Sequence, residues 1–218
     1  MSKILIVAAV ENETLVLTRK LRLTKSKNNP LLYHGTYHQH EIDLIEVGIG
    51  KVNTALNLSR AITQKNYDYA LNLGSAGGTK SFKQGDKIIV SQAKYHDFDL
   101  QIFGYKKGQV PGYPEYFMVP HKEINDFKAL IPTLKESLLY SGDRFVETSP
   151  NIDEEYVVDM EATAFFQVLY LSGIKAYAFK IVSDIINGSN YDTYSSFEEK
   201  KIGNYLYDFF LEIIEGIK

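Results

Sequence analysis

Apolar, strand-like runs alternate with helix-like segments along the whole chain, and this alternation limits the choice of fold more than any other feature. Residues 3–9 form a β-branched run, and residues 11–24 then place leucine and valine at helical spacing. The same change recurs as far as residues 202–214, where apolar side chains repeat every three or four positions. Such alternation predicts an α/β protein with a mixed, largely parallel central sheet covered by helices on both faces, in three layers.

The remaining elements follow from local patterns of apolar residues and turn formers. Residues 31–50 indicate a hairpin that ends in a glycine turn, and residues 104–120 indicate a loop rich in glycine and proline. Ser195 and Glu198 have the spacing of a capping box, which predicts the start of the last helix. Further strands are expected at residues 68–78, 86–100, 136–145, 155–160 and 176–183, and further helices at residues 52–62 and 161–171.

Composition limits the class of protein and the kind of partner. With 218 residues, the chain fits one domain over residues 1–218. The net charge of -3 gives no attraction to nucleic acid or to an anionic membrane, so a small molecule is the expected partner. The chain has no cysteine, which excludes thiolate chemistry and permits a reducing compartment. The first apolar run is too short for a membrane helix, and we expect a cytoplasmic protein.

Polar side chains and glycines follow four of the predicted strands. Ligands of open α/β sheets bind beyond the carboxyl ends of the strands, so these positions are expected to share one site. The alternative is that each acid is an ordinary first-turn residue of a helix, where the helix dipole favours negative charge. Convergence of all of them favours a small-molecule site with several carboxylates. The positions are Glu13, Ser75 with Gly77 and Gly78, residues 159–161, and Ser183 with Asp184.

Eight short motifs lie at or near these turns. They are AAVENE at residues 8–13, GIGKVNTA at 48–55, LNLGSAGG at 71–78, GDKIIVSQAKYHDFD at 85–99, FGYKKGQVPGYP at 103–114, SGDRF at 141–145, VDMEATAFFQV at 158–168 and IVSDIIN at 181–187. In this order, the motifs resemble the nucleoside phosphorylase and nucleosidase superfamily, and within it the 5'-methylthioadenosine/S-adenosylhomocysteine nucleosidases. The block from YHDFD to FGYKKGQVPG is similar to this nucleosidase branch in particular.

The resemblance implies hydrolysis of the N-glycosidic bond of 5'-methylthioadenosine and S-adenosylhomocysteine, with release of adenine. A purine leaves readily only if its N7 is protonated as the bond breaks, and the sugar becomes oxocarbenium-like. By resemblance, Asp184 is the general acid, Ser183 lies beside it, and Glu13 activates a water on the opposite face of the sugar. No metal and no cofactor are expected.

The resemblance also assigns the groups that bind the sugar. Glu161 accepts hydrogen bonds from the ribose hydroxyls, Met160 packs on the sugar ring, and Ser75 and Gly77 close around the ribose. Asp159 points the other way in an extended segment, so a structural or solvated acid is expected there.

The base and the 5' substituent have their own expected contacts. By resemblance, Phe145 stacks on adenine and the backbone of Val146 reads the edge of the base, although an ordinary core phenylalanine is the alternative for the ring. In relatives, the loop that contains Phe103 and Pro111 reaches into the pocket of the neighbouring subunit, so a homodimer is implied. The apolar end of the pocket is expected to be lined by Val10, Ile49 and Phe197.

Three features depart from the family pattern. Residues 145–160 form a shorter segment than in typical members, and residues 186–197 form a longer one. Lys180 stands where an arginine is expected, and lysine lacks the planar fork that orients a partner.

Other functions remain open from the sequence. A purine nucleoside phosphorylase would use phosphate in place of water, but Glu13 would repel the phosphate dianion. A hydrolase of another purine nucleoside, such as futalosine or AMP, would need only a different 5' pocket. A nucleoside-binding sensor without catalysis would be expected to lack the acids at positions 13, 161 and 184, which are all present.

Two further motifs have a weaker chemical interpretation. His34, His38 and His40 are close enough in sequence for a metal site, but a solvated hairpin is favoured. The segment GIGKVNT lacks the full spacing of a phosphate loop. We expect Gly48 and Gly50 to let the backbone approach the ribose.

Overall fold

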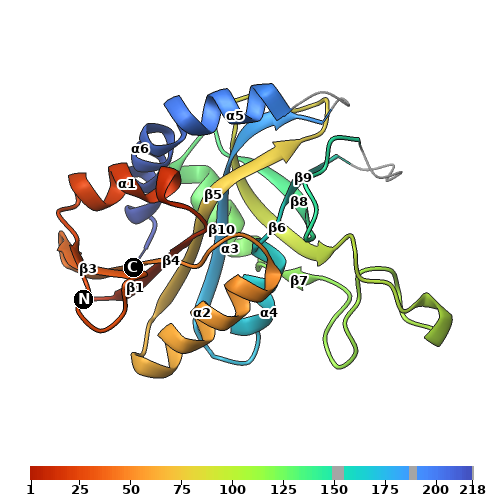
Figure 1. The fold of residues 1–218 in the computed structure, drawn as a ribbon, viewed down its shortest axis with the longest axis horizontal. Helices are drawn as coiled ribbons and strands as arrows, with labels where there is room; N and C mark the ends of the chain where they lie inside the picture. Colours follow the sequence, from red (N-terminus) through yellow and green to blue (C-terminus); the bar gives the residue numbers. More distant parts are fainter. Residues whose placement is uncertain (149–154, 187–190, 218) are drawn as a thin grey trace.

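The computed structural model describes residues 1–148, 155–186 and 191–217, and its strands form one mixed sheet (Figure 1). The segments expected to differ in length from the family, residues 145–160 and 186–197, lie partly outside the described residues. The strands are β1 (Lys3–Ala8), β2 (Thr24–Lys25), β3 (Leu32–Tyr37), β4 (His40–Glu46), β5 (Tyr69–Gly78), β6 (Lys87–Tyr95), β7 (Phe117–Met118), β8 (Lys135–Ser141), β9 (Tyr156–Asp159) and β10 (Lys175–Ile185).

Half of the sheet closes on itself. The strand order is β10-β6-β8-β9-β5-β1-β4-β3-β2, with β7 added on β6. Strand β10 also pairs in parallel with β5 along the full length of both strands, so β5, β9, β8, β6 and β10 complete a ring. The parallel pairs β1–β4, β1–β5, β6–β8 and β8–β9 confirm the predicted mixed sheet with a large parallel part.

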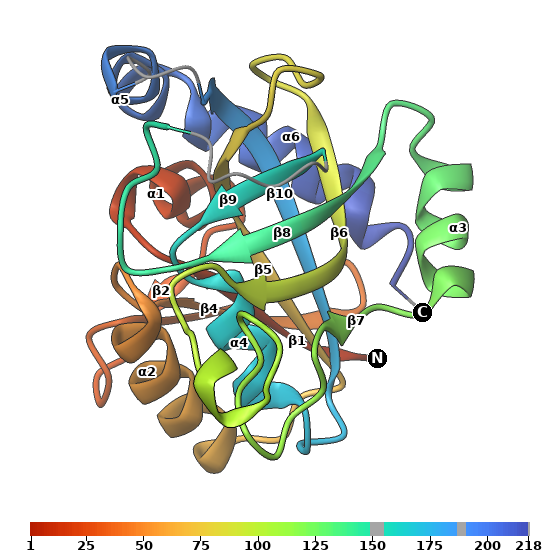
Figure 2. The same ribbon diagram turned by 90° about the vertical axis from the view of Figure 1, so that its right-hand side faces the viewer.

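Helices cover the sheet on two sides, as predicted. Helices α1, α5 and α6 lie on one side and α2 and α4 on the other (Figures 1 and 2). Contacts between α1 and α6, and between α2 and α4, complete each layer. The helices are α1 (Glu11–Lys20), α2 (Lys51–Gln64), the 3-10 helix η1 (Gln101–Phe103), α3 (His121–Leu130), α4 (Ala162–Leu169), α5 (Tyr191–Lys200) and α6 (Ile202–Ile214).

Aromatic packing holds β10 between helices. Phe209, Phe210 and Ile213 of α6 are fully buried on one helical stripe. The ring of Phe179 on β10 meets the rings of Phe209 and Phe127 edge-on, with centroids 5.7 Å and 5.0 Å apart. Each buried side chain of this size stabilises the fold by about 1.5–3 kcal/mol, so these contacts fix the strand that ends in the candidate site.

Several predicted boundaries are wrong for identifiable reasons. The first helix ends at Lys20, before residue 24, and Arg22 beyond it adopts a left-handed φ of 54°. Ser195 lies within α5, and only Lys201 separates α5 from α6, so the predicted capping box does not start the last helix. Helix α3 was not predicted, although Ile124 and Phe127 bury one of its faces. The expected strands at residues 86–100 and 136–145 end earlier, at Tyr95 and Ser141.

The predicted hairpin of β3 and β4 forms, but it is not solvated throughout. The side chain of His40 is buried, and His34 Nδ1 lies 2.8 Å from Asp43 Oδ1. Burial alone would raise the pKa of Asp43, but hydrogen bonds from His34 and Tyr67 help to lower it below its usual value. The described residues contain no group of three His, Cys, Asp or Glu side chains placed to hold a metal ion.

None of the helices in the described part of the chain has the length and apolar character that crossing a bilayer requires.

The aromatic contacts of β10 predict a large loss of stability when they are removed. The substitution Phe179→Ala is expected to lower the free energy of unfolding by about 3–5 kcal/mol, because it leaves a cavity among Phe127, Phe209 and the sheet. Urea titrations followed by circular dichroism measure this change. Met118→Ala, at a side chain that is 59% exposed, is the control and should shift stability by no more than about 0.5 kcal/mol. Equal effects of the two substitutions would contradict this packing.

Candidate active site

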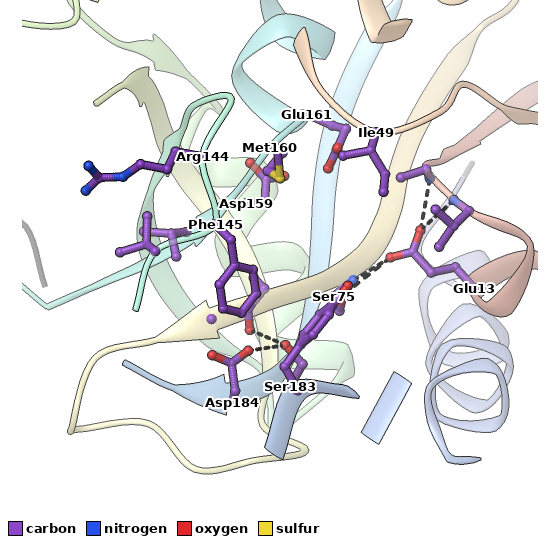
Figure 3. A pocket seen from close by; sticks show the side chains of 17 residues that line it. Glu13, Ile49, Ser75, Arg144, Phe145, Asp159, Met160, Glu161, Ser183 and Asp184 are labelled. Carbon is purple, nitrogen blue, oxygen red and sulfur yellow. Dashed lines mark hydrogen bonds between the residues drawn. The ribbon is translucent and has the colours of Figure 1, made fainter. Parts of the chain in front are cut away.

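The four strand ends converge on one pocket, as the sequence predicted. Its open space, including solvent at the mouth, amounts to about 640 Å³. Figure 3 shows Glu13 on one side of the pocket, Asp184 on another, and Glu161 above them. Glu13 comes from the first turn of α1, which follows β1, and Ser75 comes from the end of β5. Glu161 comes from the segment after β9, and Asp184 from the end of β10.

Backbone amides fix the carboxylate of Glu13 at the start of α1. Its Oε2 accepts hydrogen bonds from the backbone N of Ala9 at 2.9 Å and of Val10 at 3.4 Å. Its Oε1 accepts from the backbone N of Ser75 at 2.9 Å. Gly74 leaves room for this arrangement, because a Cβ there would lie 2.7 Å from Oε1. The result is a 5% exposed carboxylate held at the pocket wall in a single orientation.

A β-bulge sets the direction of Asp184. The register of β10 against β5 shifts between Val182 and Asp184, so Ser183 is the extra residue. The Asp184 carboxyl group is almost fully buried, and the absence of a side chain at Gly77 accommodates it, since a Cβ there would lie 3.2 Å from Oδ2. The bulge thus brings both polar side chains of the Ser183–Asp184 pair to the pocket.

The hydrogen bonds of Ser183 suit a protonated Asp184. Ser183 Oγ lies 2.6 Å from Asp184 Oδ1 and 3.2 Å from the carbonyl oxygen of Ala76. A hydroxyl has one hydrogen to donate, so it can satisfy only one of two acceptors. A protonated Asp184 would donate to Ser183 Oγ and leave the hydroxyl hydrogen for Ala76. The geometry can therefore support a neutral carboxylic acid at this position.

Glu161 is a buried acid at the start of α4. Its Oε1 accepts a hydrogen bond from the backbone N of Gly50 at 2.8 Å. Burial, followed by the charge of Asp159, raises its pKa from 4.5 to about 8, although Lys180 and the Gly50 hydrogen bond act in the opposite direction. Near neutral pH the carboxyl group therefore carries a proton in a large fraction of molecules.

Asp159 is a structural acid, and the alternative that it is solvated is wrong. Its Oδ2 lies 2.8 Å from Lys180 Nζ, and both side chains are 2% exposed. Its carboxylate also accepts hydrogen bonds from Ser141 Oγ and from the backbone N of Ala162. Burial alone would lower the pKa of Lys180, but the nearby carboxylates, Asp159 first, raise it. Lys180 is therefore a charged partner beneath the site.

The structure brings most of the sequence-predicted residues to the pocket but not all. Phe197 is 2% exposed in the core, where its ring packs 5.3 Å from that of Tyr205. Phe103, 73% exposed, and Pro111 lie on the loop after β6 and do not line this chain's own pocket. The residues that do line it, besides Glu13, Glu161, Ser183 and Asp184, are Val10, Ile49, Ser75, Gly77, Phe145, Val146 and Met160.

Sequence reasoning missed Tyr194, which lies on the same helix as Phe197. Tyr194 lines the pocket, and its ring centroid is 5.2 Å from that of Phe145. The two residues are three positions apart on α5, so they lie about one turn apart on the same side of the helix, and the placement of the helix along its axis decides which one reaches the pocket. No pattern in the sequence reports that placement. The pocket is also lined by Asp159, which was expected to be a structural or solvated acid outside the site. The other lining residues that were not predicted are Ala9, Ala76, Arg144 and Val158.

The raised pKa of Glu161 predicts a pH dependence of stability. Between pH 4.5 and about 8 the folded protein keeps a proton that the unfolded chain loses, so this group makes the free energy of unfolding fall as pH rises. The variant Glu161→Gln should flatten the fall in urea titrations across this window. Glu11→Gln, at an exposed acid on α1, is the control. The same slope in all three proteins would show that Glu161 titrates normally.

Comparisons with known proteins agree with this geometry. The model of the phosphorylase superfamily matches residues 3–206. The 5'-methylthioadenosine/S-adenosylhomocysteine nucleosidase of Buchnera aphidicola subsp. Acyrthosiphon pisum (strain Tuc7) is 34% identical over 97% of each chain. The nucleosidase of Colwellia psychrerythraea 34H in complex with adenine has a TM-score of 0.91 and 27% identity, covering 100% of this chain and 96% of its own. That of Neisseria meningitidis in complex with methylthio-immucillin-A has a TM-score of 0.89 and 27% identity, with both chains fully covered. The chain belongs to the phosphorylase superfamily and, within it, to the 5'-methylthioadenosine/S-adenosylhomocysteine nucleosidases.

Proposed function

We propose that this protein hydrolyses the N-glycosidic bond of 5'-methylthioadenosine and S-adenosylhomocysteine and releases adenine. The observation that carries the proposal is one pocket that holds Glu13, Glu161 and Asp184 on different walls (Figure 3). A 5'-methylthioadenosine/S-adenosylhomocysteine nucleosidase matches almost the whole chain, and the Colwellia nucleosidase binds adenine in its crystal structure. The fold and the arrangement of acids therefore favour the same reaction.

Asp184 is the general acid in this proposal. As the glycosidic bond breaks, the purine gains electron density and needs a proton at N7. A neutral Asp184 supplies that proton, and Ser183 then donates its hydrogen to the carboxylate that is left. The distances from Ser183 Oγ to Asp184 and to the Ala76 carbonyl are compatible with this neutral form.

Glu13 is the base that activates water. Three backbone N–H groups face its carboxylate, and they hold it without neutralising it through a cationic side chain. A water between Glu13 and the anomeric carbon would lose its proton to the carboxylate as it attacks. Because Glu13 and Asp184 reach the pocket from different walls, the attack and the departure of the base take place on opposite faces of the sugar.

Glu161 binds the ribose hydroxyls in this scheme. Its Oε1 already accepts from Gly50, and its other oxygen can meet a hydroxyl. A protonated Glu161 donates to one hydroxyl, and an ionised one accepts from both, so either form binds a cis-diol. Met160, Ser75 and Gly77, which also line the pocket, complete the contacts to the sugar in this scheme.

In this proposal the apolar side chains of the pocket bind the two ends of the nucleoside. Phe145 and the Val146 backbone take adenine next to Asp184, with Tyr194 beside Phe145, and Val10 and Ile49 take the 5' substituent. A flat aromatic ring suits stacking on a purine.

The alternative functions fit the pocket less well. For a phosphorylase, a phosphate dianion would have to lie beside Glu13, while Arg144, which carries the positive charge among the described lining residues, lies at the far side from Glu13 (Figure 3). A sensor would not need an acid and a base held on opposite walls. Futalosine or AMP as substrate would change only the contacts near the 5' position.

We also infer a homodimer formed through α2, α4 and the loop after β6. This face exposes large apolar side chains, including Val52 at 74%, Phe103 at 73% and Leu171 at 84%. Val52 and Leu171 line one groove with Ala55 and Val168, and grouped exposed apolar side chains indicate an interface more strongly than isolated ones do. Phe103 and Pro111 would then reach the pocket of the partner subunit.

A cytoplasmic location stays a prediction from the composition.

Release of free base from a panel of nucleosides tests the proposed reaction. Wild-type protein is expected to release adenine from 5'-methylthioadenosine and adenosylhomocysteine at the same rate with and without phosphate. Asp184→Asn and Glu13→Gln should each lose at least about a hundredfold in kcat, the usual contribution of a positioned acid or base. Phosphate-dependent turnover would identify a phosphorylase, preference for futalosine or AMP would replace the substrate, and binding without turnover would identify a sensor.

The dimer is tested by hydrodynamic measurement. Sedimentation of the wild-type chain at micromolar concentration should give twice the mass of one chain, and Leu171→Glu should give a monomer because it places a charge on the apolar face. Leu130→Glu, on α3 outside this face, is the matched control and should remain dimeric. A monomeric wild-type protein would refute the interface.

A further inference from the structure

Three charged side chains meet outside the pocket, at the junction of three segments, two of which supply residues that line it. Lys51 is the first residue of α2, Asp97 follows β6, and Asp143 follows β8. None of the three lines the nucleoside pocket. The reaction proposed above gives them no role, although they lie directly behind two of its binding elements.

The three side chains form a connected network. Lys51 Nζ lies 2.7 Å and 2.6 Å from the two carboxylate oxygens of Asp97, and 3.6 Å from Asp143 Oδ2. The backbone N of Lys51 donates to Asp143 Oδ1 at 2.8 Å, and the backbone N of Asp143 donates to Asp97 Oδ2 at 2.9 Å. The pKa of Asp97 is lowered: burial alone would raise it, but Lys51 and the Asp143 amide outweigh burial.

The network joins the sugar side of the pocket to the base side. The residue before Lys51 is Gly50, whose backbone N donates to Glu161, and the second residue after Asp143 is Phe145. Gly50 has a φ of +94°, and a Cβ there would lie 3.0 Å from Asp143 Oδ1, so the turn packs closely on the network.

We propose that Lys51, Asp97 and Asp143 are positioning residues that hold the Gly50 turn and the Phe145 wall at a fixed separation, and thereby set nucleoside affinity without taking part in catalysis. This inference rests on the proposed function, because it assigns ribose to Glu161 and the base to Phe145.

The contacts of the proposed catalytic acids are separate from this network. Glu13 is held by amides of residues 9, 10 and 75, and Asp184 by the bulge of β10 and Ser183. Loosening the network should therefore weaken binding in the ground state and the transition state equally, which raises KM and leaves kcat unchanged. A residue needed only for folding would instead reduce the amount of active protein and leave KM unchanged.

The experiment measures kcat and KM for 5'-methylthioadenosine in a set of variants. Asp97→Ala and Lys51→Met should each raise KM about tenfold, with kcat within about twofold of wild type. Lys51→Arg, which keeps a cation able to bind both oxygens of Asp97, should retain a near-normal KM. Asp126→Ala is the matched control, since Asp126 forms a 2.7 Å ion pair with Lys122 on α3, away from the pocket.

Two results would overturn the inference. One is a KM for Asp97→Ala and Lys51→Met that equals the wild-type or Asp126→Ala value, and the other is a loss of kcat with KM unchanged. Calorimetric affinity for adenine is measured in the same proteins. If wild-type protein turns over no nucleoside, the proposed function fails. In that case, weaker adenine binding by Asp97→Ala than by the wild-type protein still supports the network. Equal adenine affinity in the two proteins refutes it.

Discussion

The parallel pairing of β5 with β10 is the constraint on which the rest of the site depends. It closes the ring of five strands and places the segment Ser75–Gly78 beside Ser183 and Asp184. Parallel strands end on the same side of a sheet, so both strands deliver their polar ends to one place. The bulge in β10 then adds the single residue that turns two consecutive polar side chains toward the pocket.

The site concentrates negative charge in a buried place, and each acid has a different means of tolerating it. Backbone amides hold Glu13, the Lys180 ammonium pairs with Asp159, and the Gly50 amide donates to Glu161, which also keeps a proton to higher pH. Asp184 has the hydroxyl of Ser183. Burying acids in this way lowers the stability of the fold, and buried acids with shifted pKa values are typical of functional sites. An oxocarbenium-like sugar would be stabilised by those carboxylates of the pocket that are ionised.

Much of the architecture could be predicted because local patterns report it. Alternating strands and helices indicated the mixed sheet, and polar residues after apolar runs indicated Glu13, Ser75 and Asp184 as neighbours. The closure of the ring could not be predicted, because it depends on a pairing between β5 and β10 far apart in the sequence. The same holds for Lys180, whose partner Asp159 is found only when β10 and β9 are in place.

Other errors arose where the placement of one helix or one boundary decides the outcome. Phe197 and Tyr194 fit a pocket wall equally well by residue type, and the placement of α5 along its axis brings Tyr194 to the pocket. The capping box predicted at Ser195 is wrong, because this residue lies inside α5 and starts no helix. Local chemistry thus identified the candidate residues, while tertiary packing decided which of them face the pocket.

The most direct measurement is a crystal structure of the Glu13→Gln variant with intact 5'-methylthioadenosine. The account predicts purine N7 within hydrogen-bond distance of the Asp184 carboxyl group, and an ordered water on the other face of the sugar beside residue 13. A nucleoside bound with N7 turned away from Asp184, or with both residues on one face of the sugar, would contradict it.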